Sequence, residues 1–140
     1  MITRDEIRSI PDLHKSILRD KEQLHFLHEK ATSVPSGLSE GERVQTSPDN
    51  KAGKYIDAAA DLHREILEKE ADLMRLQSDA EEFIETVDDS LAKKVLRYRY
   101  LKCMKWSDIA ELLGYVEGYL REIEREAVKE LLPPAPTYVI

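Results

Sequence analysis

The sequence predicts an all-α protein, and three observations support that prediction. Two long segments repeat apolar residues at steps of three and four, which is the spacing of one face of an α-helix. Leu, Glu, Lys, Ala and Arg are abundant and only five of the 140 residues are glycine, a composition typical of long exposed helices. Residues 106–131 show the pattern of two short helices joined by a tight turn.

The first helix is expected over residues 3–31. Its apolar positions follow the a and d spacing of a coiled-coil seam, with Asp20 at one seam position. Pro11 is expected to mark the first turn of the helix proper, where its missing N–H does no harm. The apolar seam consists of Ile10, Leu13, Ile17, Leu24, Leu27 and Ala31.

A long loop is expected at residues 32–51, because this stretch contains two prolines, two glycines and several Ser and Thr residues. A second long helix, at 51–87, again repeats apolar residues at steps of three, four or seven. Two long helices joined by one loop should fold back as an antiparallel, coiled-coil-like hairpin over residues 1–88. Such a hairpin has little core of its own. We therefore expect its apolar stripes to pack against a second copy, as a homodimer, or against the C-terminal unit.

The third helix is expected at 91–105, after Asp88-Asp89-Ser90 breaks the pattern and supplies N-cap chemistry. This is the most basic part of the chain, since no carboxylate occurs between Asp89 and Asp108. Cys103 lies within it. Basic surroundings could lower the pKa of its thiol, although packing is the simpler role.

Residues 106–131 combine several features of a helix-turn-helix. Ser107 can cap a short first helix, and the small Ala110 allows the second helix to cross closely. Gly114 is expected to take the left-handed conformation of the turn. Leu120 and Ile123 then fall where the second helix, from 116 or 117 to 132, must bury apolar side chains. The helix-turn-helix domain is expected at 89–132, followed by a proline-rich tail at 133–140.

The charge pattern of the second helix bears on what it could bind. The chain has a net charge of −7, which counts against strong non-specific binding to nucleic acid, but the local field of one face matters more. At about 100° per residue, Arg121, Arg125 and Lys129 form one row, roughly opposite the apolar side. The alternative is that this row makes only intrahelical ion pairs with glutamates, worth about 0.2–0.5 kcal/mol each.

A family resemblance accompanies this pattern. An Arg99-Tyr100 pair is followed by Trp106, Ile109-Ala110, Leu113-Gly114-Tyr115 and a helix ending in Ala127 to Leu131. Over residues 97–131, the last third of the helical region, the chain resembles phage-encoded transcriptional regulators of the ArpU and RinA type, which are similar to region 4 of sigma factors. The likeness before this region is looser. Such regulators usually have Ser or Thr after Gly-Tyr, where this chain has Val116-Glu117-Gly118.

The resemblance implies control of phage or prophage genes through promoter double-stranded DNA, RNA polymerase or both, in the cytoplasm of a bacterial host. A lone cysteine, no signal-peptide pattern and no apolar run long enough for a bilayer agree with that location and with no membrane role. The expected DNA contacts are Arg121, Arg125, Lys129 and Tyr119 on the second helix and Lys93, Lys94, Arg97 and Lys102 on the basic helix before it.

Other functions remain open at this point. The chain could be a protein-interaction or assembly module that retains the helix-turn-helix without tight DNA binding. It could also be a DNA-packaging adaptor, although those usually place the binding unit first. An enzyme is the least expected, because there is no phosphate-binding loop or nucleophile elbow, and we expect no cofactor. His25 and His28 lie one helical turn apart, but two histidines do not define a metal site.

Overall fold

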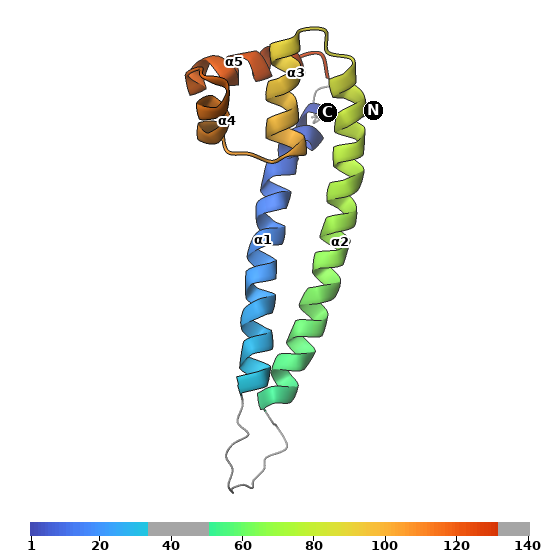
Figure 1. Ribbon diagram of the computed structural model, residues 1–140. Coiled ribbons are helices and arrows are strands. Elements are labelled where there is room, and N and C mark those ends of the chain that lie inside the picture. The colour runs from blue at the N-terminus through green and yellow to red at the C-terminus, as the bar shows by residue number, and fades with distance from the viewer. Residues whose placement is uncertain (34–50, 132–140) are drawn as a thin grey trace, which may run out of the picture. The chain divides into compact units, whose positions relative to one another are not determined.

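The computed structural model describes residues 1–33 and 51–131, and over these residues the protein is helical and contains no β-strand. The all-α prediction is therefore confirmed for the described part of the chain. Residues 34–50 of the expected loop and the tail at 133–140 lie outside the described residues. The elements are α1 (Arg4–Ser33), α2 (Lys51–Glu85), α3 (Ser90–Leu96), the π-helical turn η1 (Arg97–Leu101), α4 (Trp106–Leu113) and α5 (Glu117–Val128) (Figure 1).

The contacts divide the chain into two compact units, and both long helices contribute to each. Of the described residues, one unit contains 1–15 and 71–131, and the other contains 16–33 and 51–70. The sequence suggested a boundary at 88/89 instead. The difference arises because Ile7 and Ile10 of α1 and Ile84 of α2 are fully buried in the same apolar cluster as Leu96 and Val128.

The start of α1 is fixed by a reciprocal cap. The Thr3 hydroxyl accepts a hydrogen bond from the Glu6 N–H at 3.1 Å, and the Glu6 carboxylate accepts one from the Thr3 N–H at 3.0 Å. Ile2 and Ile7 flank this capping box and are both buried, as in a hydrophobic staple. Pro11 consequently lies about two turns inside α1. The expectation that it marks the first turn was wrong, because the Thr-x-x-Glu signal starts the helix before it.

The unit of residues 16–70 pairs the later part of α1 with the first part of α2. Lys21 lies 2.9 Å from Glu70, and Lys69 lies 2.7 Å from Asp20. Further along α1, His28 lines a common pocket with Ala59. Because the contacting residue number on α2 falls as the number on α1 rises, the two helices pair in antiparallel orientation. Asp20, the polar residue in the apolar seam, is thus neutralised by Lys69.

Apolar side chains on the outer surface of α2 remain exposed within the described residues. Ile56, Leu67 and Met74 are each more than half exposed. They lie at spacings compatible with one helix face, beside the exposed Ala60 and Ala71. The expected association with a second copy stays a prediction. Within residues 1–33 and 51–131, no helix combines the length and the apolar content needed to cross a bilayer.

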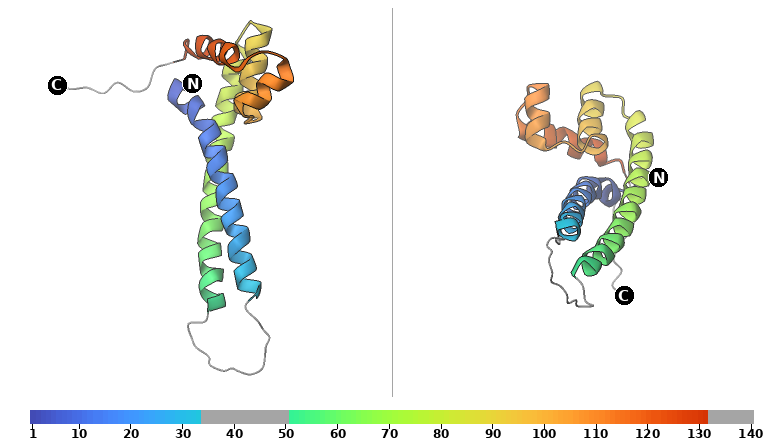
Figure 2. Two further views of the ribbon diagram at one scale, coloured as in Figure 1. Left: turned by 90° about the vertical axis from the view of Figure 1, so that its left-hand side faces the viewer. Right: turned by 60° about the horizontal axis from the view of Figure 1, so that its bottom comes forward.

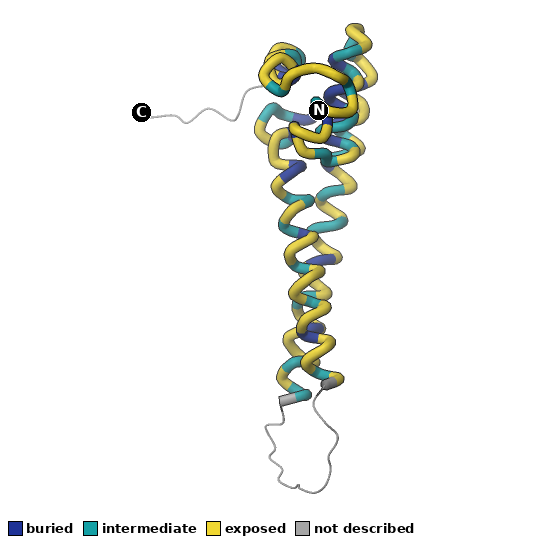
Figure 3. Tube along the Cα trace, turned by 60° about the vertical axis from the view of Figure 1, so that its left-hand side comes forward, coloured by how far each residue is buried: buried dark blue, intermediate teal, exposed yellow. Residues whose placement is uncertain are grey.

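The remaining unit has two apolar clusters, separated by α3. Leu96 enters the first cluster, with residues of α1, α2 and α5, and Val95 enters the second, with Trp106, Ile109 and Leu120. Figure 3 shows the buried positions recurring along the helices between exposed ones. α5 contacts both α3 and α4, and Figures 1 and 2 show these three helices grouped together.

The basic helix expected at 91–105 is shorter than predicted. Asp89 caps its start as expected, accepting a hydrogen bond from the Ala92 N–H at 2.9 Å. The helix then widens into η1 and stops at Leu101, and Cys103 has a positive φ of 56°. The amide of Gln77 donates hydrogen bonds to the carbonyls of Tyr100 and Leu101, at 2.9 and 3.2 Å. These contacts from α2 satisfy the end of the helix where the sequence offered no stop signal.

We predict that Thr3→Ala lowers the free energy of unfolding by about 1 kcal/mol, because the substitution removes the hydroxyl that accepts a hydrogen bond from the Glu6 N–H. Urea denaturation followed by circular dichroism measures the change. Thr32→Ala is the matched control, since the Thr32 hydroxyl bonds back to carbonyls near the exposed C-terminal end of the same helix. Equal destabilisation by the two substitutions would contradict the role given to Thr3.

Candidate nucleic-acid interface

The turn between α4 and α5 has the geometry expected from the sequence. Gly114 has φ 80° and ψ 28°, and its N–H donates to the carbonyl of Ala110 at 2.9 Å. This is the left-handed conformation that favours glycine. Ile109 on α4 and Leu120 on α5 are fully buried in the same apolar cluster. Both helices are therefore held by a small core in which Leu120 is buried, as the sequence predicted. Leu112 of α4 lies outside this core and is 57% exposed.

The helix starts in this region lack side-chain caps. The N-cap of α4 is Lys105, whose carbonyl accepts from the Ile109 N–H at 3.0 Å, so the expected cap at Ser107 is wrong. Ser107 lies inside the first turn because α4 begins at the buried Trp106. α5 begins at Glu117, and its N-cap residue, Val116, makes no side-chain hydrogen bond to the helix. That absence agrees with the missing Ser or Thr noted in the sequence.

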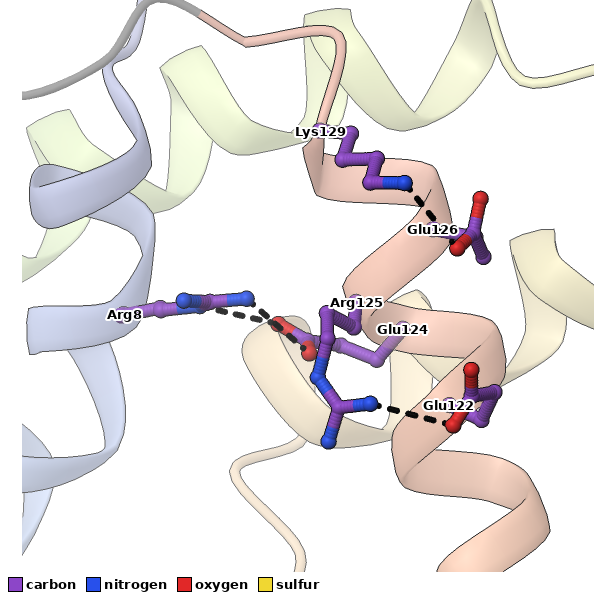
Figure 4. A network of polar contacts seen from close by, with 6 residues as sticks. All are labelled: Arg8, Glu122, Glu124, Arg125, Glu126 and Lys129. Carbon is purple, nitrogen blue, oxygen red and sulfur yellow. Dashed lines mark hydrogen bonds and ion pairs between the residues drawn. The ribbon is translucent and has the colours of Figure 1, made fainter.

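Glu124 is a buried carboxylate on α5 and was not recognised from the sequence, where it counted as one of several surface glutamates. It is 6% exposed. The Tyr100 hydroxyl donates to its Oε2 at 2.5 Å, and the Arg8 guanidinium contacts both carboxylate oxygens at 3.4 Å. Figure 4 shows Arg8 reaching from α1 to this carboxylate. Its spacing could have indicated its burial, because Glu124 lies four residues after Leu120 and four before Val128, on the same side of α5.

Burial of Tyr100, helped by the nearby Glu124 charge and their hydrogen bond, raises the pKa of the Tyr100 hydroxyl well above its usual range. The hydroxyl consequently stays protonated and remains a donor at neutral pH. Burial also raises the pKa of the Cys103 thiol, although Arg99 and Gln77 act in the opposite direction. The suggestion that basic surroundings lower the pKa of Cys103 is therefore wrong, and its packing role fits better.

The basic row of α5 is present, but its position differs from the expected one. Leu120, Glu124 and Val128 form the buried side of α5. Each residue of the basic row directly follows one of them in the sequence, so the row lies about 100° around the helix from the buried side rather than opposite it. The row consists of Arg121, Arg125 and Lys129, which are 52%, 58% and 64% exposed. The shift follows from the burial of Glu124 by Arg8 and Tyr100.

Each residue of the basic row has an exposed glutamate partner on the same helix. Arg121 contacts Glu117 at 3.2 Å, Arg125 contacts Glu122 at 3.0 Å, and Lys129 contacts Glu126 at 3.2 Å (Figure 4 shows the last two). The intrahelical pairs considered as the alternative are therefore present. Exposed pairs of this kind contribute only about 0.2–1 kcal/mol, so they do not prevent these side chains from binding another anion.

The other expected contact residues fall into two groups. Lys93 and Arg97 both form ion pairs with Glu85 of α2, so the structure joins them to that helix. Lys94 and Lys102 are exposed. Tyr119 is 48% exposed, and its ring lies 5.3 Å from that of Tyr115. The structure does not bring all eight expected residues into one patch through direct contacts.

The two flanks of α5 differ sharply in charge. One flank borders a pocket of about 320 Å³ lined by Arg8, Pro11, Arg99, Tyr100, Trp106, Arg121, Glu124 and Arg125. We call it the arginine pocket. The other flank borders a pocket of about 420 Å³ whose lining includes the carboxylates Asp88, Asp89, Glu122, Glu126 and Glu130. A polyanion approaching α5 would be attracted to the first flank and repelled from the second.

An apolar patch is exposed at the turn between α4 and α5. Leu112, Tyr115, Val116 and Tyr119 are each 44% to 74% exposed. All four lie within five residues of Gly114 in the sequence, and the ring centres of Tyr115 and Tyr119 are 5.3 Å apart. Exposed apolar patches often mark contacts with another macromolecule. Among the described residues, no group of three or more His, Cys, Asp or Glu side chains is arranged to hold a metal ion.

We predict that alkaline pH destabilises the protein through Tyr100. Above pH 10.0, the ordinary pKa of tyrosine, the unfolded chain loses this proton while the folded chain retains it. The folded state then binds more protons, so its stability falls as pH rises, by up to about 1.4 kcal/mol per pH unit. Denaturant unfolding between pH 9 and 11 measures the slope. Tyr100→Phe should lose this part of the slope, and identical slopes for both proteins would contradict the assignment.

Comparisons with known proteins do not identify a family. A search of family models found no match, and searches of curated proteins and of solved structures found no significant match.

Proposed function

We propose that the protein is a phage-type transcriptional regulator that binds promoter DNA through a helix-turn-helix similar to sigma region 4, formed by α4 and α5 and preceded by an α1–α2 hairpin. One observation carries the proposal: α4 and α5 are joined by a tight turn at Gly114, and arginines lie along one flank of α5. The resemblance of residues 97–131 to ArpU- and RinA-type regulators adds to it.

The charge distribution around α5 supports an approach of DNA from the arginine side. Arg121 and Arg125 stand at the edge of α5 next to Arg8 and Arg99, which line the same pocket. Glu124 adds little repulsion there, because Arg8 neutralises it and the Tyr100 hydroxyl occupies one of its oxygens. Phosphate contacts of this kind position a helix-turn-helix on a duplex, whereas base contacts give it specificity.

Binding by this protein should be modest in strength and sensitive to salt. The net charge of −7 opposes the approach of DNA at a distance, and only a few arginines offset it locally. Glu117 at the start of α5 adds a carboxylate where many helix-turn-helix proteins approach the backbone. These features favour recognition that depends on a specific site, or on a second bound protein, over general attachment to DNA.

Fluorescence polarisation with labelled duplex DNA, including promoter fragments from the gene's own neighbourhood, tests the proposal. We expect binding that weakens as salt is added, and loss of most of it in the double variant Arg121→Glu, Arg125→Glu. Arg64→Glu is the matched control, because Arg64 also forms an exposed pair with an aspartate three residues away but lies in the other unit. Absence of binding at low salt, or equal loss in the control, would refute DNA binding through α5.

A second candidate function is protein interaction, with RNA polymerase as the expected partner. The exposed patch of Leu112, Tyr115, Val116 and Tyr119 favours it, since four large apolar side chains at one turn are suited to a protein surface. In this role the helix-turn-helix would serve as a scaffold, and tight DNA binding would not be needed.

A pull-down of purified bacterial RNA polymerase by the tagged protein, after nuclease treatment, separates the two functions. Retention that survives nuclease and is lost in Val116→Glu would support the protein-interaction role. Val116 is 74% exposed, so the substitution should leave the core intact. Leu18→Glu, at a half-exposed apolar position in the other unit, is the control. No retention of polymerase would count against this candidate.

A further inference from the structure

The arginine pocket contains more positive charge than its own carboxylate can balance. Four arginines line it, from α1, η1 and α5, and the one carboxylate in its lining is Glu124. Both oxygens of Glu124 are engaged by Arg8. Arg99, Arg121 and Arg125 therefore have no carboxylate partner within the lining, although Arg121 and Arg125 pair with Glu117 and Glu122 outside it.

Arg99 has no carboxylate partner among the ion pairs of the described residues. Its guanidinium donates a hydrogen bond to the carbonyl of Met104 at 2.9 Å and lies 5.1 Å from the centre of the Trp106 ring. These contacts use only part of its five N–H donors. They also hold the guanidinium in place, so the free donors are already oriented before any ligand arrives.

Arg121 and Arg125 can turn toward the pocket at low cost. Their partners Glu117 and Glu122 are 42% and 61% exposed, and exchanging an exposed pair for another anion sacrifices little free energy. The Arg121 guanidinium also lies 5.3 Å from the centre of the Trp106 ring, and its hydrogen bond to Glu117 uses only part of its five N–H donors. Three guanidiniums around one pocket match a dianion with several acceptor oxygens better than a single carboxylate.

We propose that the arginine pocket binds a phosphate group, supplied either by the backbone of a nucleic acid or by a phosphorylated small molecule. Guanidinium groups recognise phosphate through paired N–H donors, and a pocket of about 320 Å³ lies at the lower end of the range for small-molecule sites. The proposal does not depend on DNA binding, because the pocket could hold a free phosphate compound in a protein that never contacts a duplex.

The only tryptophan of the chain, Trp106, lines the pocket and provides the readout. Binding that moves Arg99 or Arg121 over the indole ring should change its fluorescence. We expect a saturable change when the protein is titrated with sodium phosphate at constant ionic strength, and again with a nucleoside 5′-monophosphate. Sodium chloride alone, at the same ionic strength, should give no saturable change.

Two substitutions on α5 provide a matched comparison. Arg125→Gln should raise the half-saturating phosphate concentration about tenfold, because a hydrogen bond to a charged group is lost. Lys129→Gln removes the same charge from a side chain of similar exposure and equivalent i,i+3 pairing, but Lys129 does not line the pocket. It should change the half-saturation by less than about twofold, which is the size of a screened surface effect. Circular dichroism of both variants checks that they remain folded.

A short duplex titrated in the same assay distinguishes the source of the phosphate. Competition between the duplex and the free phosphate compound supports the pocket and assigns it to the nucleic-acid backbone. Saturation by the phosphate compound without any response to DNA supports the pocket, assigns it to a small molecule and removes the DNA-binding function proposed above. No saturable response to phosphate, or equal weakening by Arg125→Gln and Lys129→Gln, overturns the proposal.

Discussion

A buried carboxylate on α5 holds together parts of the chain that are far apart in sequence. The Glu124 carboxylate accepts hydrogen bonds from the Arg8 guanidinium of α1 and from the Tyr100 hydroxyl of η1. Glu124 needs these partners, because a carboxylate whose side chain is only 8% exposed has little water to solvate it. The Arg8 side chain is 44% exposed, so solvent screens its ion pair with Glu124. The three residues must therefore be placed together, and this fixes how α5 is rotated about its own axis.

The rotation of α5 decides which of its charges face outward. With Glu124 turned inward, Arg121 and Arg125 border the arginine pocket, while Glu122, Glu126 and Glu130 border the acidic pocket on the other side. A helix that is acidic in total composition thus presents a basic flank and an acidic flank. Net charge alone would have described neither flank, because it averages over both.

Local patterns in the sequence were sufficient for the elements whose signals lie within one turn. The helical periodicity, the Asp89 cap and the left-handed Gly114 follow from residue type and spacing. The Thr3 capping box was equally readable and agrees with the expected helix over residues 3–31, yet Pro11 was expected to mark the first turn. That error came from giving more weight to one proline than to a two-residue cap.

Features that depend on contacts distant in sequence could not be predicted in this way. The end of the basic helix at Leu101 depends on Gln77, and the burial of Glu124 depends on Arg8. The arginine pocket has the same origin, because its lining comes from three separate stretches of the chain. The expected DNA contacts were chosen along the basic helix and α5, so Arg8 of α1 could not be included. Arg99 lies on the expected basic helix, but nothing in the local sequence distinguished it from its basic neighbours.

The contact between Arg8 and Glu124 also has a consequence for the order of events during synthesis. The two residues are 116 positions apart, so the first α1 turns leave the ribosome long before their partners exist. The later part of α1 can pair with α2 as soon as α2 has emerged, whereas Arg8 must wait for Glu124 on α5. The apolar cluster around Ile7 and Ile10 can form in part with α2, but it is completed only when Val128 arrives. Closing so long a loop is slow and late. The beginning of the chain is thus among the last parts of the molecule to reach its final neighbours.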